Sequence, residues 1–346
     1  NGALDAVLAS IKDNDLELVC IGGIVPNPRF SKVLEGLGVC RREEVDFLLA
    51  VGGGSVIDST KAIGLGLANE GDLWDYFSFK RYPKNKFPIG VVLTAAGSGS
   101  EMSDCAVLTR DADSSKSFCD SDLLRPTFAL MNPELTFTVP AAQTAYGCVD
   151  MIVHVLERYF SANTFPLSDG LSEVILKTVV KKGPTALMVP NDYSVRANLM
   201  WAASLAQNGL VACGSSGGDW VSHCLANELG GVFDVPHGAA LSAVWATWAR
   251  YVVEARPTRF ARLAESVFDI EPHLDGAETT ARYAIDALES FFFFFRTPTR
   301  IAQLGINMTD DVAASLAKRC CAEDGRMGSI RSLGRKDMEQ IYRLAR

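Results

Sequence analysis

The 346-residue sequence lacks the features that mark several large classes of protein. No apolar run approaches the ~20 residues that span a bilayer, and no signal peptide is visible at its start. The net charge is −8 without a basic stripe, which argues against nucleic acid as a partner. Nine scattered cysteines without a CxxC pair predict free thiols and a cytoplasmic location. With 48% hydrophobic residues, the chain is typical of a soluble enzyme with a large core.

Two common phosphate-binding patterns are also missing, since there is neither a GxGxxG fingerprint nor a glycine followed by Lys-Ser/Thr. Instead, three consecutive glycines (52–54) follow the apolar run 47–51, and a helical pattern covers 55–67 with Ser55 as the expected N-cap. Glycines let N–H groups crowd against an anion, and a helix N-terminus adds positive charge, so we expect a phosphate here. The alternative is a tight turn without a ligand. A second glycine/serine turn, 94–101, offers hydroxyls to the same ligand.

Histidine is scarce, and three of the four histidines fall into one pattern with an aspartate. Asp150 and His154 are four residues apart, which on a helix places both side chains on one face. With His223 and His237 they form a set that suits Fe(II) or Zn(II) better than Ca or Mg. The spacing alone leaves open that Asp150 and His154 are ordinary helix-surface or core residues. His273 lies in a polar segment and is expected at the surface.

Short apolar strands alternate with helical patterns in the first part of the chain, which is typical of a parallel sheet with crossover helices. The expected strands are residues 16–21, 47–51, 89–93, 106–109 and 128–131, and a helix is expected over 1–18. After Pro140 the pattern is helical, with examples at 141–161, 169–181, 194–207, 218–229, 237–251 and 259–267. We therefore predict an α/β domain over 1–140 and an all-helical domain over 141–346. Five phenylalanines at 291–295 cannot all face one side of a helix.

Four segments occur in the order found in the iron-containing (group III) alcohol dehydrogenases: 52–58, 94–101, 147–159 and 223–238. The chain resembles the butanol dehydrogenase and broad-specificity aldehyde reductase branch of that family over essentially its whole length. The resemblance implies hydride transfer between a primary alcohol or aldehyde and NAD or NADP, with one divalent metal. It also implies an N-terminal dinucleotide-binding domain, a helical metal-binding domain, a cleft between them for metal and nicotinamide, and a homodimer.

Site residues are carried over by position from the family. The resemblance implies metal ligands at Asp150, His154, His223 and His237, a pyrophosphate turn and flank at Gly52, Gly53, Gly54, Ser55 and Asp58, a second cofactor turn at Thr94 and Ser98, and ribose and nicotinamide neighbours at Val107 and Lys116. It assigns no catalytic residue beyond the ligands. The branch favours NADP over NAD, although no residue of this chain decides between them, and the ligand set suits iron and zinc alike.

The chain departs from the family pattern at two places. Members of this branch commonly carry a histidine four residues after the third ligand, where this chain has Asn227, so a proton relay through that position is in doubt. The family also places a strand and a glycine-rich turn before the first helix, and we expect that this opening strand is missing.

Two other functions compete with the dehydrogenase interpretation. A metal-dependent lyase of the dehydroquinate synthase type shares the architecture but requires Lys and Arg groups near the metal, and Lys177, Lys181 and Lys182 lie outside the ligand segments. A non-catalytic binding protein descended from the family would be expected to have lost ligands, and only Asn227 points that way.

Overall fold

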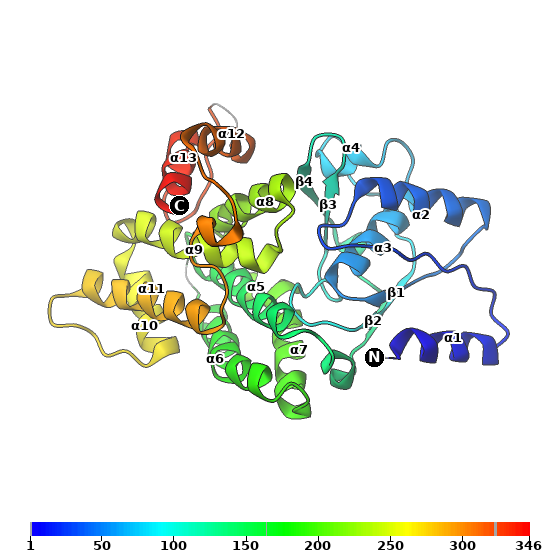
Figure 1. Cartoon of the computed structure of the whole chain (residues 1–346), viewed down its shortest axis with the longest axis horizontal. Coiled ribbons are helices and arrows are strands. Elements are labelled where there is room, and N and C mark those ends of the chain that lie inside the picture. The colour runs from blue at the N-terminus through cyan, green and yellow to red at the C-terminus, as the bar shows by residue number, and fades with distance from the viewer. Residues whose placement is uncertain (1, 164, 322–323) are drawn as a thin grey trace. The chain divides into compact units, whose positions relative to one another are not determined.

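The computed structural model describes residues 2–163, 165–321 and 324–346, which form two compact units (Figure 1). The first unit consists of Asn1–Val139 together with Val189–Asn208, and the second of Pro140–Met188 with Gly209–Arg346. The segment 189–208 thus belongs to the first unit although it follows two helices of the second. The sequence-based division of the chain into two contiguous domains at residue 140 does not account for this segment, and it stays a prediction.

A three-stranded parallel sheet forms the centre of the first unit. Its strand order is β1 (Leu48–Gly52), β2 (Ile89–Leu93) and β5 (Phe128–Leu130). Every residue of the central strand β2 is buried, which explains its unbroken apolar sequence, because a parallel strand is covered on both faces. Gly52 pairs with Leu93, so β1 and β2 end level with each other. The two glycine turns that follow them therefore leave from the same edge of the sheet.

Helices cover this sheet, as the sequence predicted. Helix α3 (Gly54–Ala68) packs against β1 and β2. The unit also contains α1 (Ala3–Asp13), α2 (Phe30–Arg42), α4 (Trp74–Phe77) and α7 (Tyr193–Gln207), with 3₁₀ turns η1 (Asp122–Leu124) and η2 (Pro133–Thr136). Met200 of α7 packs with Ile57 of α3 and Val91 of β2 in one buried apolar cluster. Helix α1 is shorter than the expected 1–18, and Asn1 lies outside the described residues.

Two of the expected strands are not part of the parallel sheet. Residues 16–21 form no strand. Leu16 is 63% exposed and Leu18 49% exposed, so these apolar side chains are not packed as they would be in a strand of the sheet. The segment expected at 106–109 is β3 (Cys105–Arg110), which pairs antiparallel with β4 (Ser115–Asp120), a strand that the sequence did not indicate. Four residues separate β3 from β4, enough for a hairpin but far too few for the crossover that parallel strands need.

The second unit is helical throughout its described residues, apart from one isolated bridge between Met327 and Leu333. Helix α5 packs against α6 and α9, and α9 packs against α8. The helices are α5 (Ala141–Tyr159), α6 (Pro166–Met188), α8 (Val221–Phe233), α9 (His237–Val252), α10 (Pro257–Phe268), α11 (Ala277–Phe294), α12 (Asp310–Cys320) and α13 (Arg335–Leu344), with 3₁₀ turns η3 (Leu210–Ala212), η4 (Val253–Ala255) and η5 (Ile301–Leu304).

Details of three elements differ from expectation. Helix α6 continues past residue 181 through Pro184, and α8 begins at Val221 rather than at residue 218. The phenylalanine run ends α11, where Phe291, Phe292 and Phe295 are buried while Phe293 and Phe294 are 73% and 58% exposed. Among the described residues, no helix is both long and apolar enough to cross a membrane.

Candidate functional site

Helix α5 presents three buried acidic and imidazole side chains along one face. Asp150, His154 and Glu157 are spaced i, i+4 and i+7, which brings them to the same side of the helix on successive turns. Their exposed fractions are 8%, 6% and 1% in a helix that is otherwise buried mainly through apolar residues. Ionisable groups are almost never fully buried without a partner, so this face of α5 requires one.

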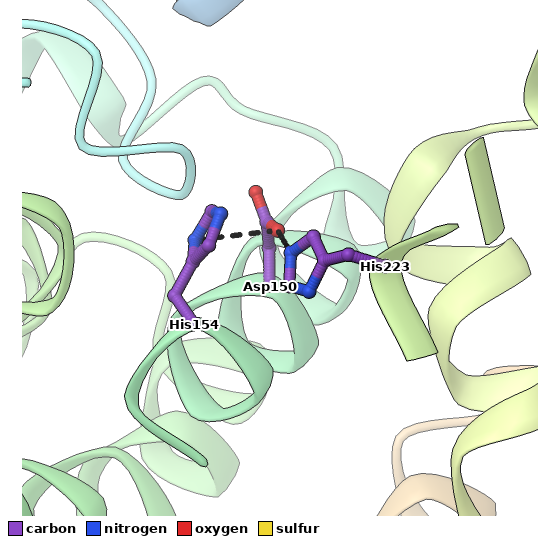
Figure 2. Close-up of side chains that lie close together, drawn as sticks. All are labelled: Asp150, His154 and His223. Carbon is purple, nitrogen blue, oxygen red and sulfur yellow. Dashed lines mark ion pairs between the residues drawn. The ribbon is translucent and has the colours of Figure 1, made fainter. Parts of the chain in front are cut away.

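Helices α8 and α9 bring the other two histidines to the same place. His223 lies in the first turn of α8, and His237 is the first residue of α9, directly after Pro236. Figure 2 shows the side chains of His154 and His223 directed toward Asp150 from two different helices. Asp150 Oδ1 lies 3.5 Å from His154 Nδ1, 3.9 Å from His223 Nε2 and 3.6 Å from His237 Nε2.

Ligand atoms of Asp150, His154 and His223 all lie within 4.8 Å of one another, close enough to share one ion, and His237 lies beside them. Nitrogen and oxygen ligands about 2.0–2.2 Å from a tetrahedral zinc are separated from each other by about 3.3–3.6 Å. The imidazole rings also lie close together, since the His154 and His223 centroids are 4.7 Å apart and those of His223 and His237 5.4 Å apart. Neutral imidazoles gain little from such proximity, whereas a shared cation would stabilise all of them.

Two imidazole nitrogens in this cluster have no hydrogen-bond partner. His154 Nδ1 and His223 Nε2 are buried, and neither forms a hydrogen bond with any residue that the structure describes. Burial lowers the pKa of His154 well below its usual value, and the neighbouring His223 lowers it further. His154 is therefore neutral near pH 7 and carries a lone pair that can bind a metal. The donor set and these nitrogens both fit Fe(II) or Zn(II).

Glu157 is part of this site, although the sequence analysis did not identify it. It lies three residues after His154, and its Oε1 is 2.9 Å from His223 Nδ1. The signal in the sequence was the i+7 spacing from Asp150, which predicts a third polar residue on the ligand face of α5. That signal is weak by itself, because glutamates are common on helices and its partner is on α8, distant in the sequence.

In the first unit the two glycine turns touch each other. The N-cap of α3 is Gly53 and no side chain caps this end, so Ser55 is not the N-cap that the sequence predicted. A Cβ atom on Gly54 would lie 3.0 Å from Ser98 Cβ and closer still to its Oγ. Thr94 N–H donates to Gly52 O at 3.0 Å. A side chain at 54 would therefore push on Ser98, because the second turn packs directly against the first.

Asp58 joins α3 to both the second turn and the β3–β4 hairpin. Ser100 Oγ donates to its Oδ1 at 2.5 Å, and Val107 N–H donates to its Oδ2 at 3.1 Å. Both oxygens are thus used within the protein, which fits a residue that flanks the phosphate turn and positions it. Burial raises the pKa of Asp58, opposed by the neighbouring Lys61.

Lys61 is a second polar residue that the sequence analysis missed. Its side chain is completely buried, and its Nζ donates to Ser103 O, Ser103 Oγ and Cys105 O at 2.8–3.0 Å. In the sequence, Lys61 is only a lysine within an apolar helical pattern. That pattern does not indicate a structural role until the carbonyl groups that accept from the lysine are known.

The remaining predicted residues lie as follows. Val107 and Lys116 are diagonal neighbours on one face of the hairpin, because Val107 pairs with Phe118. Lys116 Nζ donates to Asn27 Oδ1 at 3.0 Å. Asn227 is half-buried on α8, one turn after His223, at the position of the commonly present histidine.

Comparison with known proteins gives matches over nearly the whole chain. The family described as "Iron-containing alcohol dehydrogenase" matches residues 1–133, and "Fe-containing alcohol dehydrogenase family, C-terminal" matches residues 144–346. The "Probable NADH-dependent butanol dehydrogenase 2" of Bacillus subtilis is 37% identical over 346 residues, covering 99% of this chain and 88% of the relative. The "NADPH-dependent aldehyde reductase YqhD" of Escherichia coli is 37% identical over 314 residues, covering 88% of this chain and 79% of the relative.

The fold has matches among solved structures as well. The NADH-dependent butanol dehydrogenase A of Thermotoga maritima superimposes with a TM-score of 0.94 at 33% identity, covering all of this chain and 89% of that one. The Escherichia coli YqhD structure gives 0.93 at 32% identity, covering 100% and 88%. Sequence and fold agree, and the chain belongs to the iron-containing alcohol dehydrogenase family.

Proposed function

We propose that this protein is a metal-dependent oxidoreductase that interconverts a primary alcohol and its aldehyde by hydride transfer with NAD(H) or NADP(H). The observation that supports this most is the buried group of Asp150, His154 and His223, whose ligand atoms lie within 4.8 Å of one another, with His237 Nε2 3.6 Å from Asp150 Oδ1. The relatives named above are butanol dehydrogenases and an aldehyde reductase, which supports a small alcohol or aldehyde as the substrate.

The four side chains would hold one Fe(II) or Zn(II). That ion supplies Lewis-acid chemistry, because it polarises a carbonyl oxygen or lowers the pKa of an alcohol. Asp150 offsets part of the charge of the ion, while the histidines contribute neutral nitrogen ligands. His154 remains neutral across the physiological range because burial lowers its pKa, so little competition from protons is expected.

The glycine turns would bind the nucleotide. Gly52, Gly53, Gly54 and Ser55 open α3, whose first N–H groups have no partners within the helix and carry its positive dipole end. Those groups would receive the pyrophosphate.

The side chains around those turns would place the rest of the cofactor. Thr94 and Ser98 would add hydroxyls from the second turn, and Asp58 would hold that turn in place. Val107 and Lys116, on one face of the hairpin, would lie beside the ribose and nicotinamide.

Several finer properties belong to the same proposal. We expect a cytoplasmic homodimer with an α/β domain over 1–140 and a helical domain over 141–346. The nine cysteines, none of them in a disulfide, fit a reducing compartment. Light scattering of the purified protein tests the dimer, since a monomer mass at micromolar concentration would exclude it.

The decisive experiment is NADH and NADPH oxidation with short aldehydes, before and after chelation and refilling with Fe(II) or Zn(II). We expect activity with at least one cofactor, loss on chelation and recovery on refilling. If neither NADH nor NADPH were oxidised with either metal, the proposal would be overturned.

A matched pair of variants tests the ligand assignment independently. His237→Ala should lose its metal by elemental analysis, whereas His273→Ala removes the one histidine outside the cluster and should keep about one metal per chain. Metal retained by His237→Ala would contradict the assignment.

No observation favours the lyase alternative. Lys177, Lys181 and Lys182 lie on α6, and Lys177 Nζ is 3.8 Å from Asp269 rather than directed at the histidine cluster. The relatives named above are oxidoreductases. A non-catalytic binding protein is also disfavoured, because all four ligand side chains are present and converge.

A further inference from the structure

Glu157 receives four hydrogen bonds, and every donor comes from the segment 220–223 at the start of α8. Its Oε1 accepts from Ser222 Oγ at 2.6 Å, from His223 N at 3.1 Å and from His223 Nδ1 at 2.9 Å. Its Oε2 accepts from Trp220 N at 2.5 Å. The side chain is 1% exposed, so water contributes little to satisfying it.

These contacts replace a cap that α8 does not have. The first residues of a helix have N–H groups without helical partners. The N-cap of α8 is Trp220, whose φ is +63° and whose side chain makes no cap hydrogen bond. Glu157 reaches across from α5 and accepts two of those N–H groups, with a charge that the helix dipole favours. The start of α8 is thereby fixed to the helix that carries Asp150 and His154.

The same carboxylate selects which nitrogen of His223 carries the proton. Backbone N–H groups can only donate, and one reaches each oxygen of Glu157, so the carboxyl group acts as an acceptor at both. His223 Nδ1 therefore donates to Oε1, and its Nε2 keeps a lone pair. That Nε2 is 3.9 Å from Asp150 Oδ1 and forms no hydrogen bond with the described residues.

We propose that Glu157 is the positioning residue of the metal centre: it holds His223 in the Nδ1-protonated form and directs Nε2 toward Asp150. The inference rests on the proposed metal site and adds to it a residue outside the ligand set. Partners of this kind orient metal-binding histidines, and their loss typically weakens metal binding about 10- to 100-fold.

Two conservative variants separate positioning from a general effect of charge. Glu157→Gln has the same length, so its amide oxygen can stay beside His223 Nδ1 while the amide nitrogen faces Trp220 N–H. Glu157→Asp keeps the charge but is one methylene shorter, so its oxygens withdraw from Nδ1. Positioning predicts that the Asp variant is the more damaged of the two, whereas a role of charge alone predicts the reverse.

The control is Glu228→Gln, which changes another buried glutamate on α8. Glu228 is 9% exposed and accepts from Arg319 Nε at 2.5 Å, so Glu228→Gln weakens an ion pair on the same helix. This control reports how far a lost ion pair on the same helix alters the metal centre through stability alone.

Each protein is stripped of metal, and its Zn(II) affinity is measured by competition with a chromophoric chelator. The His223 tautomer is read from ¹⁵N NMR of the zinc-free protein, and thermal unfolding is recorded alongside. We expect Glu157→Asp to lose the Nδ1–H form and to bind zinc about 10- to 100-fold more weakly. Glu157→Gln should keep the tautomer and lose less, and Glu228→Gln should match the wild type in both.

The inference would be overturned if Glu157→Asp kept both the Nδ1–H tautomer of His223 and its affinity for zinc. It would also be overturned if Glu157→Asp lost no more zinc affinity than Glu157→Gln. An equal loss of zinc in Glu228→Gln would also overturn it. A wild-type protein that binds no zinc would instead overturn the metal site itself, so the two failures are distinguishable.

Discussion

Lys61 of the first unit and His154 of the second are both buried nitrogen bases on helices, yet their surroundings differ in one decisive respect. The ammonium group of Lys61 donates to three oxygens of residues 103–105, all within hydrogen-bond distance. His154 Nδ1 forms no hydrogen bond with the described residues, although it is equally inaccessible to water. The first base is satisfied by the protein, and the second is arranged for something the protein binds.

Buried polar groups without partners are rare because each costs about 1–3 kcal/mol. A cluster that contains two such groups must gain more from its ligand than it loses in the free protein. We therefore expect the Lys61 network to stabilise the fold and the histidine cluster to lower the stability of the metal-free protein.

The largest effect is expected from Asp150→Asn. Asp150 Oδ1 lies within 3.5–3.9 Å of all three imidazoles, and a neutral amide is a poor ligand for a divalent ion. We expect loss of bound metal and a fall in kcat/KM of at least about 1,000-fold, since the Lewis acid supplies several kcal/mol. The metal-free variant should unfold at the same temperature as the metal-free wild type or higher. An Asp150→Asn protein that retained its metal would contradict the role of Asp150 as a ligand.

Lys61→Met should have the opposite consequence. Removing the ammonium leaves the buried Ser103 carbonyl without a donor and Cys105 O with only the hydrogen bond from Ser103 Oγ, and we expect a loss of about 3 kcal/mol in the free energy of unfolding. Urea denaturation measures it. Metal content per folded chain should not change, and a loss below about 1 kcal/mol would show that the network is not structural.

Removal of the metal should destabilise the wild type without the chemical changes of mutagenesis. Zinc at 100 times its dissociation constant adds about 2.7 kcal/mol to the free energy of unfolding, because it binds only the folded protein. Thermal unfolding with and without chelator measures this difference. Asp150→Asn, treated identically, should show no shift, and an equal shift in that variant would place the zinc elsewhere.

Gly54→Ala tests the close approach of the two glycine turns. A Cβ at position 54 would press against Ser98, and we expect a cost of about 1 kcal/mol together with a severalfold higher KM for the nucleotide. Gly54→Ala combined with Ser98→Gly should recover part of that loss relative to the sum of the single variants. Strict additivity of the two changes would show that the turns do not press on each other.

The smallest expected effect concerns pH. Burial lowers the pKa of Lys61, opposed by Asp58. The unfolded chain therefore holds this proton more tightly than the folded protein, so the contribution of Lys61 to stability rises with pH until about 10.5. The free energy of unfolding of the wild type should rise relative to that of Lys61→Met as the pH increases toward about 10.5, by at most about 1.4 kcal/mol per pH unit. Urea denaturation from pH 8 to 10 measures it, and a difference that shrinks with pH would contradict the prediction.

Much of the fold was predictable because its signals are local. Strand β2 was predicted at its observed residues from a short apolar run, and the α5 and α9 helices from periodicity after Pro140 and Pro236. The strand expected at 16–21 fails because an apolar run becomes a strand only beside a partner. The hairpin β3–β4 was missed because β4 is polar and mostly unburied, so it carries no apolar alternation.

The candidate site divides in the same way. The four proposed ligand residues were predicted from scarcity, spacing and the resemblance to a family, none of which requires coordinates. Glu157 and Lys61 were not identified, because a glutamate or lysine in a helix is common. Their meaning depends on Ser222 and His223 in one case and on Ser103 and Cys105 in the other.

The amino-acid sequence by itself determined which side chains this protein can offer to a metal and where its glycines allow an anion to approach. Those properties follow from residue type and from the period of a helix, which are fixed along the chain. Only the tertiary structure decided that α8 is capped by a carboxylate from α5 and that one nitrogen of His223 is left facing Asp150. The reason is physical, because hydrogen-bond partners and burial are set by residues that are distant in sequence and adjacent only after folding.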